Sequence, residues 1–122
     1  MHELTVKASF SAAHAITIRG EREPLHGHDW LVTLTVGAPA TGPDGLICDF
    51  HALLESLRNA IAPFHNRTLN DVPPFDRLNP TAELVAQHIG QTVAASLAPG
   101  VTLISARVTE AIGCAAIWRP DA

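Results

Sequence analysis

Positive charge is scarce in this sequence. Its 122 residues include 8 Lys and Arg against 12 Asp and Glu, which gives a formal net charge of −4, and Lys7 is the single lysine. Surfaces that bind nucleic acid or anionic membranes need clustered cations. The composition therefore excludes nucleic acid and membrane surfaces as expected partners.

Cysteines and long apolar runs are scarce as well. Cys48 and Cys114 have neither a Cys-x-x-Cys spacing nor the density of a disulfide scaffold, so we expect two reduced thiols. No stretch approaches the roughly 18 consecutive apolar residues of a membrane span, and the first residues show no signal-peptide pattern. We expect a cytoplasmic protein with one domain over residues 1–122, small enough for other subunits to complete its cleft.

Histidines carry the clearest chemical signal. His26-Gly27-His28 is a His-x-His pair, and residues i and i+2 of a strand project from one face, so both imidazoles can reach one ion. His14 is the candidate third ligand. Three neutral imidazoles leave one position of Zn²⁺ open, as in catalytic zinc sites, although they would also accept Ni²⁺, Co²⁺ or Fe²⁺. The other reading, an ordinary packed or solvated side chain, is the one we give to His2, His51 and His88.

Two periodicities divide the rest of the chain. Period-two alternation predicts strands over residues 4–10, 30–36, 104–109 and 114–118. One helix is predicted from the cap Asp49 to Pro63, and a second from the cap Asn79, with Pro80 at its first position, to Pro99-Gly100. The order strand, strand, helix, helix, strand, strand predicts an α+β fold, a four-stranded antiparallel sheet with two helices on one face.

Six short motifs, in their order and separations, resemble the 6-pyruvoyl-tetrahydropterin synthase / 6-carboxytetrahydropterin synthase family over about residues 4 to 119. They are Phe10-Ser11-Ala12-Ala13-His14, Leu25-His26-Gly27-His28, Gly45-Leu46-Ile47-Cys48-Asp49-Phe50, Leu69-Asn70, Asn79-Pro80-Thr81-Ala82-Glu83 and Thr109-Glu110. The resemblance implies a T-fold (tunnelling fold), in which subunits pair their sheets into a barrel, commonly as a homotrimer or homohexamer with active sites between subunits. It also implies Zn²⁺ bound by His14, His26 and His28, in agreement with their spacing.

The resemblance further implies a pterin substrate. Glu110 would hold the pterin ring, and the segment around Thr81 and Glu83 would make a second contact. A carboxylate can accept two N–H bonds, from the 2-amino group and a ring nitrogen of a pterin. Each glutamate also has an ordinary explanation, Glu110 as a charged residue at a strand end and Glu83 as an acidic residue favoured by the helix dipole.

The chain departs from the family at the catalytic positions. The best-known members have a cysteine where this chain has Arg22, and an Asp-His pair where it has His65 and Asn66. Glu23 lies three residues before His26. This pattern resembles a variant branch in which a glutamate replaces the cysteine and the side chain of 7,8-dihydroneopterin triphosphate is cleaved to 6-hydroxymethyl-dihydropterin for folate synthesis.

We therefore expect a zinc-dependent pterin lyase with Glu23 and His65 as catalytic candidates. The alternatives are that Glu23 belongs to an ordinary charged loop with Glu21 and Arg22, and that His65 is an ordinary loop histidine. Arg22 and Arg67 are candidate contacts for the triphosphate. Two other functions stay open: synthesis of a 6-carboxy- or 6-pyruvoyl-pterin, and pterin binding without turnover.

Overall fold

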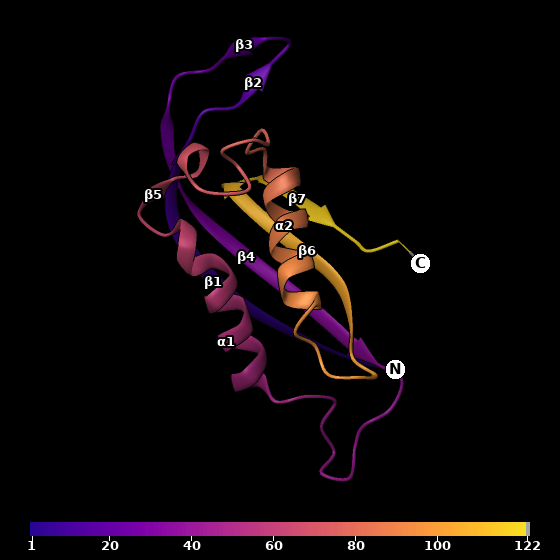
Figure 1. The fold of residues 1–122 in the computed structure, drawn as a ribbon. Coiled ribbons are helices and arrows are strands. Elements are labelled where there is room, and N and C mark those ends of the chain that lie inside the picture. The colour runs from indigo at the N-terminus through magenta and orange to yellow at the C-terminus, as the bar shows by residue number, and fades with distance from the viewer. Residues whose placement is uncertain (122) are drawn as a thin grey trace.

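Two long antiparallel strands form the centre of the sheet. The structure, a computed structural model, describes residues 1–121. Strands β1 (His2–His14) and β4 (His26–Ala38) pair along their whole lengths, from His2 opposite Ala38 to His14 opposite His26. Strand β6 (Thr102–Ala111) pairs antiparallel with β4, and β7 (Cys114–Trp118) with β6 (Figure 1). The four predicted strands are confirmed.

The structure adds short strands that the sequence did not predict. Strand β5 (Arg67–Thr68) pairs in parallel with β1, which makes a five-stranded sheet in the order β5-β1-β4-β6-β7. Strands β2 (Thr17–Ile18) and β3 (Glu21–Arg22) form a hairpin that projects beyond the sheet (Figure 1). The prediction of a four-stranded, wholly antiparallel sheet was wrong in this respect, because a strand of two residues has no periodicity to detect.

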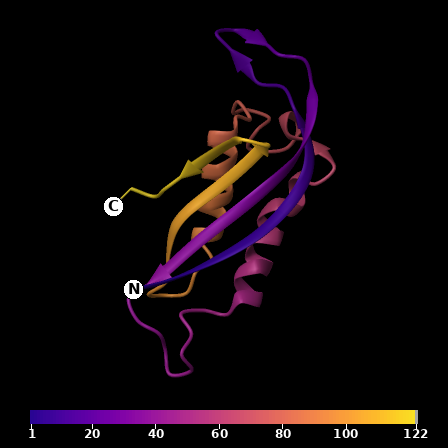
Figure 2. The same cartoon turned by 180° about the vertical axis from the view of Figure 1, so that it is seen from behind.

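Both helices cover the same face of the sheet, as predicted (Figures 1 and 2). Helix α1 (Phe50–Ile61) is capped by Asp49, whose side chain accepts a hydrogen bond from the backbone N–H of His51. Helix α2 (Ala82–Ala94) is shorter than predicted at both ends. Its cap is Thr81 and not Asn79, whose side chain binds the backbone of Thr17 instead. Within residues 1–121, no helix has the length and apolarity needed to cross a bilayer.

The face under the helices forms the apolar core. The rings of Phe10 on β1 and Trp30 on β4 stack with centroids 5.9 Å apart, and Leu57 and Ile89 pack from the two helices. Successive side chains of a strand alternate between faces. The alternation that buries Trp30 therefore places His26 and His28 on the same face, at the end of the core.

Candidate metal centre

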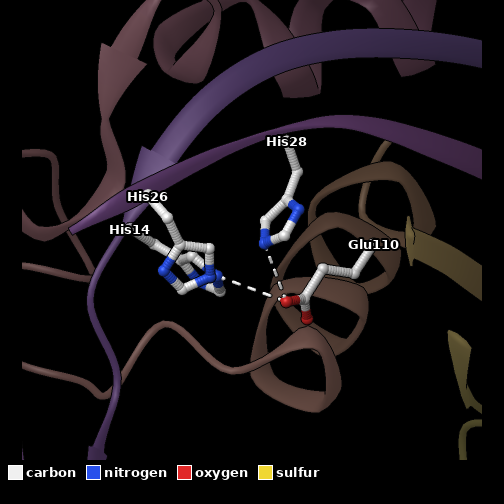
Figure 3. Close-up of side chains that lie close together, drawn as sticks. All are labelled: His14, His26, His28 and Glu110. Atoms are coloured by element: carbon white, nitrogen blue, oxygen red, sulfur yellow. Dashed lines mark ion pairs between the residues drawn. The ribbon is translucent and has the colours of Figure 1, made fainter. Parts of the chain in front are cut away.

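Strand register brings the three candidate histidines together. His14 lies directly opposite His26, and Ala12 opposite His28, so all three imidazoles leave one face of the β1–β4 pair (Figure 3). The ring centroids are 4.8 Å apart for His14 and His26, 4.7 Å for His26 and His28, and 5.1 Å for His14 and His28. The sequence prediction that these side chains face one point therefore agrees with the geometry.

Backbone carbonyls orient two of the imidazoles. Nδ1 of His14 lies 2.8 Å from the carbonyl oxygen of Pro80, and Nδ1 of His26 lies 2.9 Å from that of Pro24. A carbonyl can only accept, so Nδ1 carries the proton and Nε2 keeps its lone pair for a ligand. The sequence does not reveal these two contacts, because a backbone oxygen leaves no signature in residue type.

A carboxylate completes the cluster. Oε1 of Glu110 lies 3.0 Å from Nε2 of His28 and 3.4 Å from Nε2 of His14, and one candidate ligand atom from each of the four residues lies within 4.8 Å of the others (Figure 3). Despite the approach of this oxygen, neither of the two buried nitrogens forms a hydrogen bond with any of residues 1–121. An unpaired buried nitrogen is costly, and a cation between the four side chains would satisfy both. The donor set of three imidazoles and one carboxylate suits Zn²⁺.

Electrostatics keep His28 in the form that can bind a metal. Burial lowers the pKa of His28, and the neighbouring His14 and His26 lower it further, while Glu110 acts in the opposite direction. A neutral imidazole is the ligating form.

A cavity of about 500 Å³ adjoins the cluster. It lies between the start of α2 and strand β7, and Glu110 and Glu83 both line it. Glu110 thus borders the histidines on one side and this cavity on the other. The hydroxyl of Thr81 accepts a hydrogen bond from the backbone N–H of Leu84. Thr81 therefore serves as the N-terminal cap of α2.

Glu23 lies beside His26, on the Nδ1 side of its ring. Its Oε1 accepts a hydrogen bond of 3.0 Å from the backbone N–H of Ile16 and lies 3.7 Å from Nδ1 of His26. The four-residue group does not include it. Arg22, its neighbour, is exposed on the hairpin.

A second cavity, of about 510 Å³, is lined by one of two residues predicted to contribute to the site, Arg67, and not by the other, His65. It is lined by His28 and Arg67 together with Ser11, Asp29 and others, but His65 is not among the lining residues. His65 is exposed, and its Nδ1 accepts a hydrogen bond of 3.2 Å from the backbone N–H of Ser11. The structure therefore brings Arg67 close to a candidate ligand and leaves His65 apart.

Comparison with known proteins shows both related sequences and related folds. The family model of 6-pyruvoyl tetrahydropterin synthase matches residues 3–121. The structure of 6-pyruvoyl tetrahydropterin synthase from Caenorhabditis elegans is similar, with a TM-score of 0.84 and 19% identity over 99% of this chain and 98% of that one. No match was found among curated protein sequences.

Two further similarities concern other organisms. Two variants of Plasmodium vivax 6-pyruvoyltetrahydropterin synthase, named as catalytic-residue mutants in which a glutamate is replaced by alanine or cysteine, have TM-scores of 0.79 at 19% identity over 99% of this chain and 98% of theirs. An uncharacterised protein of Wolinella succinogenes has a TM-score of 0.79 at 15% identity over 98% of both chains. The shared architecture confirms the predicted T-fold, and because the family model spans nearly the whole sequence, the chain belongs to the 6-pyruvoyl tetrahydropterin synthase family.

Proposed function

We propose that this chain is a zinc-dependent lyase that cleaves the side chain of 7,8-dihydroneopterin triphosphate to give 6-hydroxymethyl-dihydropterin. The observation that carries the proposal is the group of His14, His26, His28 and Glu110 at the edge of a 500 Å³ cavity. Zn²⁺ held by the three histidines would lower the pKa of the vicinal hydroxyls of the substrate.

The cavity beside Glu110 would take the pterin ring. The carboxylate of Glu110 is partly exposed, at 26% for the side chain, and accepts N–H bonds from the 2-amino group and a ring nitrogen in this proposal. Glu83 lines the same cavity from the first turn of α2 and offers a second carboxylate to the ring donors. Thr81 contributes by fixing the start of that helix.

Glu23 is the proposed base. It takes the proton of one side-chain hydroxyl, and the oxygen becomes the carbonyl of the departing fragment as the adjacent C–C bond breaks. The bond electrons pass into the pterin ring, and the carbon left on the ring receives the proton that Glu23 removed. The named glutamate mutants of the Plasmodium vivax relative support a catalytic glutamate in this family.

Assembly belongs to the same proposal. We expect a homotrimer or homohexamer, since the outer edge of β7 pairs with no other strand in the part of the chain that the structure describes. His65 lies outside the cluster of its own chain, so it would act as an acid or base only at the site of a neighbouring subunit. Arg22 and Arg67 are the proposed contacts for the triphosphate.

One observation favours a second candidate function, pterin binding without turnover. Oε1 of Glu23 is already engaged by the N–H of Ile16, which is the contact of a structural residue. In that case zinc and the cavity would be kept for binding alone.

Incubation of the zinc-loaded protein with 7,8-dihydroneopterin triphosphate, followed by mass spectrometry of the products, tests the lyase proposal. We expect 6-hydroxymethyl-dihydropterin, and a rate about 10²–10⁴-fold lower for Glu23→Gln with zinc content unchanged. Glu21→Gln, an exposed position of the same hairpin, is the matched control and should keep the rate. A 6-carboxy or 6-pyruvoyl product, or a rate insensitive to Glu23→Gln, would contradict the proposal.

A further inference from the structure

The chain segment that follows His14 is held residue by residue from both sides. Residues 15–17 lead from strand β1, which ends at His14, into strand β2, and Glu23 directly follows strand β3 of the same hairpin. In each of these three residues, the backbone N–H and the backbone C=O both form a hydrogen bond with the same partner residue, and each residue has a different partner. The partners are Asn70, Glu23 and Asn79.

Two asparagine side chains bind this segment in the same way. Asn70 Oδ1 accepts from the N–H of Ala15 at 2.9 Å, while Asn70 Nδ2 donates to the Ala15 oxygen at 2.8 Å. Asn79 repeats the pattern on Thr17, at 2.9 Å and 2.8 Å. In an antiparallel ladder two opposite residues exchange both bonds in this manner, so each amide takes the place of a strand residue.

The two amides continue an existing sheet edge. Thr68 of β5 pairs with Ala13 on β1, and Asn70 and Asn79 then follow on Ala15 and Thr17. Backbone groups at positions i and i+2 of an extended chain point to the same edge, which explains the spacing of two.

The residue between them is bound from the other side by Glu23. The N–H of Ile16 donates to Oε1 of Glu23 at 3.0 Å, and the N–H of Glu23 donates to the oxygen of Ile16 at 2.9 Å. Because Ala15 and Thr17 are held in place, Ile16 between them is held as well. The N–H of Ile16 in turn holds the Glu23 carboxylate beside His26.

The same asparagines act on the histidine cluster. Asn79 precedes Pro80, whose carbonyl oxygen lies 2.8 Å from Nδ1 of His14. Asn70 holds Ala15, the residue next to His14. The fully buried ring of His14 is thus oriented directly by the contact of its Nδ1 with Pro80. It is also positioned indirectly by the hydrogen bonds that fix the backbone of Ala15 and Thr17.

We infer that Asn70 and Asn79 are positioning residues, which hold His14 and Glu23 in the geometry that the metal centre requires. The inference rests on the proposed function only for the presence of a metal, and it does not depend on the reaction. Residues that orient a metal ligand change metal affinity by about 10–100-fold when they are replaced.

Asn70→Asp and Asn79→Asp are the sharpest substitutions. Each keeps the shape of the side chain and the accepting Oδ1, but replaces the donor by an oxygen that faces the carbonyl of Ala15 or Thr17. For the full chain we expect an affinity for Zn²⁺, measured against a chromogenic chelator, that falls about 10–100-fold. The visible spectrum of the Co²⁺-loaded protein should change, and hydrogen exchange at Ala15 and Thr17 should accelerate.

Two control variants distinguish the loss of a positioning contact from a general loss of stability. Asn59→Asp makes the same chemical change at an exposed position of α1 and should alter none of the three measurements. Ile89→Val destabilises the buried core of α2 and should leave Zn²⁺ affinity unchanged. Asn79→Ala, which removes the bonds without adding charge, replaces the aspartate variant if that does not fold.

The outcomes are distinct. Unchanged Zn²⁺ affinity and Co²⁺ spectrum in the asparagine variants would overturn the inference, as would an equal loss of affinity in Ile89→Val. Loss of affinity confined to the asparagine variants supports it, even if the wild-type protein forms no lyase product, a result that would instead remove the proposed function.

Discussion

The carboxylate of Glu110 lies 3.0 Å from Nε2 of His28, and the same side chain lines the cavity proposed for the pterin. One residue therefore borders both the candidate metal centre and the candidate substrate pocket. A carboxylate there can complete the coordination of a metal, or it can accept the N–H donors of a bound ring. The two roles predict different results for one substitution.

Replacement of Glu110 by glutamine distinguishes them. In the pterin-binding role, the substitution weakens two charge-assisted hydrogen bonds of about 1.5–3 kcal/mol each, so KM should rise at least tenfold while zinc content stays complete. Steady-state kinetics and metal analysis on the same preparation provide the measurement. Glu83→Gln, which changes the other carboxylate that lines the cavity, should raise KM less. A loss of zinc with Glu110→Gln would assign Glu110 to the metal instead.

Zinc removal should lower stability by a predictable amount. A ligand that binds only the folded chain adds about 2.7 kcal/mol at a free concentration 100 times its dissociation constant. Urea unfolding with and without a chelator measures this difference. His26→Gln removes one candidate ligand and should abolish the zinc-dependent part, whereas His51→Gln, at an exposed position of α1, should retain it. Equal zinc stabilisation in both variants would contradict the assignment of His26.

Much of this site was accessible from the sequence. The His-x-His spacing and the alternation of residues 30–36 were enough to predict that His26 and His28 face one side, because a strand has a fixed period of two. Glu110 was named as a pterin contact, but its place beside His28 was not predicted. Extending the alternation from Val108 would have indicated it, since Val108 is fully buried on the helix-covered face.

Other features had no signal of this kind. The cap of α2 was assigned to Asn79 because Asn is a common cap and Pro80 suits a first helical position. Tertiary contacts decided otherwise, since the Asn79 amide satisfies two backbone groups of Thr17, which lies 62 residues away in sequence. Side-chain bonds to a distant backbone depend on the completed fold, so residue type alone does not reveal them.

His88 should make the protein sensitive to mild acid. Its ring packs edge-on against Phe64 and Phe75, at centroid distances of 5.7 and 5.6 Å, and burial lowers its pKa below the ordinary value of 6.5. The unfolded chain then binds a proton that the folded chain does not, so the free energy of unfolding falls as pH drops through 6.5 toward the lowered pKa. His88→Leu should reduce this slope, which denaturant unfolding at several pH values measures. The zinc-free protein is the sample, with His51→Leu as the control, and an unchanged slope in His88→Leu would exclude the mechanism.

Gly90 packs closely against the sheet, with no room for a side chain. A Cβ atom at this position would lie 2.7 Å from Cε3 of Trp118 and 3.0 Å from Cβ of Ala106. Alanine gains about 1 kcal/mol over glycine in a helix, but overpacking typically costs about 1–3 kcal/mol. We expect the clash to prevail in Gly90→Ala, because Ala106 belongs to the fully buried part of β6 and its Cβ moves only with the backbone.

The measurement is the free energy of unfolding, with Gln91→Ala at the neighbouring exposed position as the control for helix propensity alone. Gly90→Ala should be less stable than Gln91→Ala by about 1–2 kcal/mol. The substitution also forces α2 away from β7, and these two elements enclose the cavity that Glu83 and Glu110 line. Pterin affinity should therefore fall together with stability. A Gly90→Ala variant that is as stable as wild type and binds pterin equally well would mean that this helix does not set the width of the cavity.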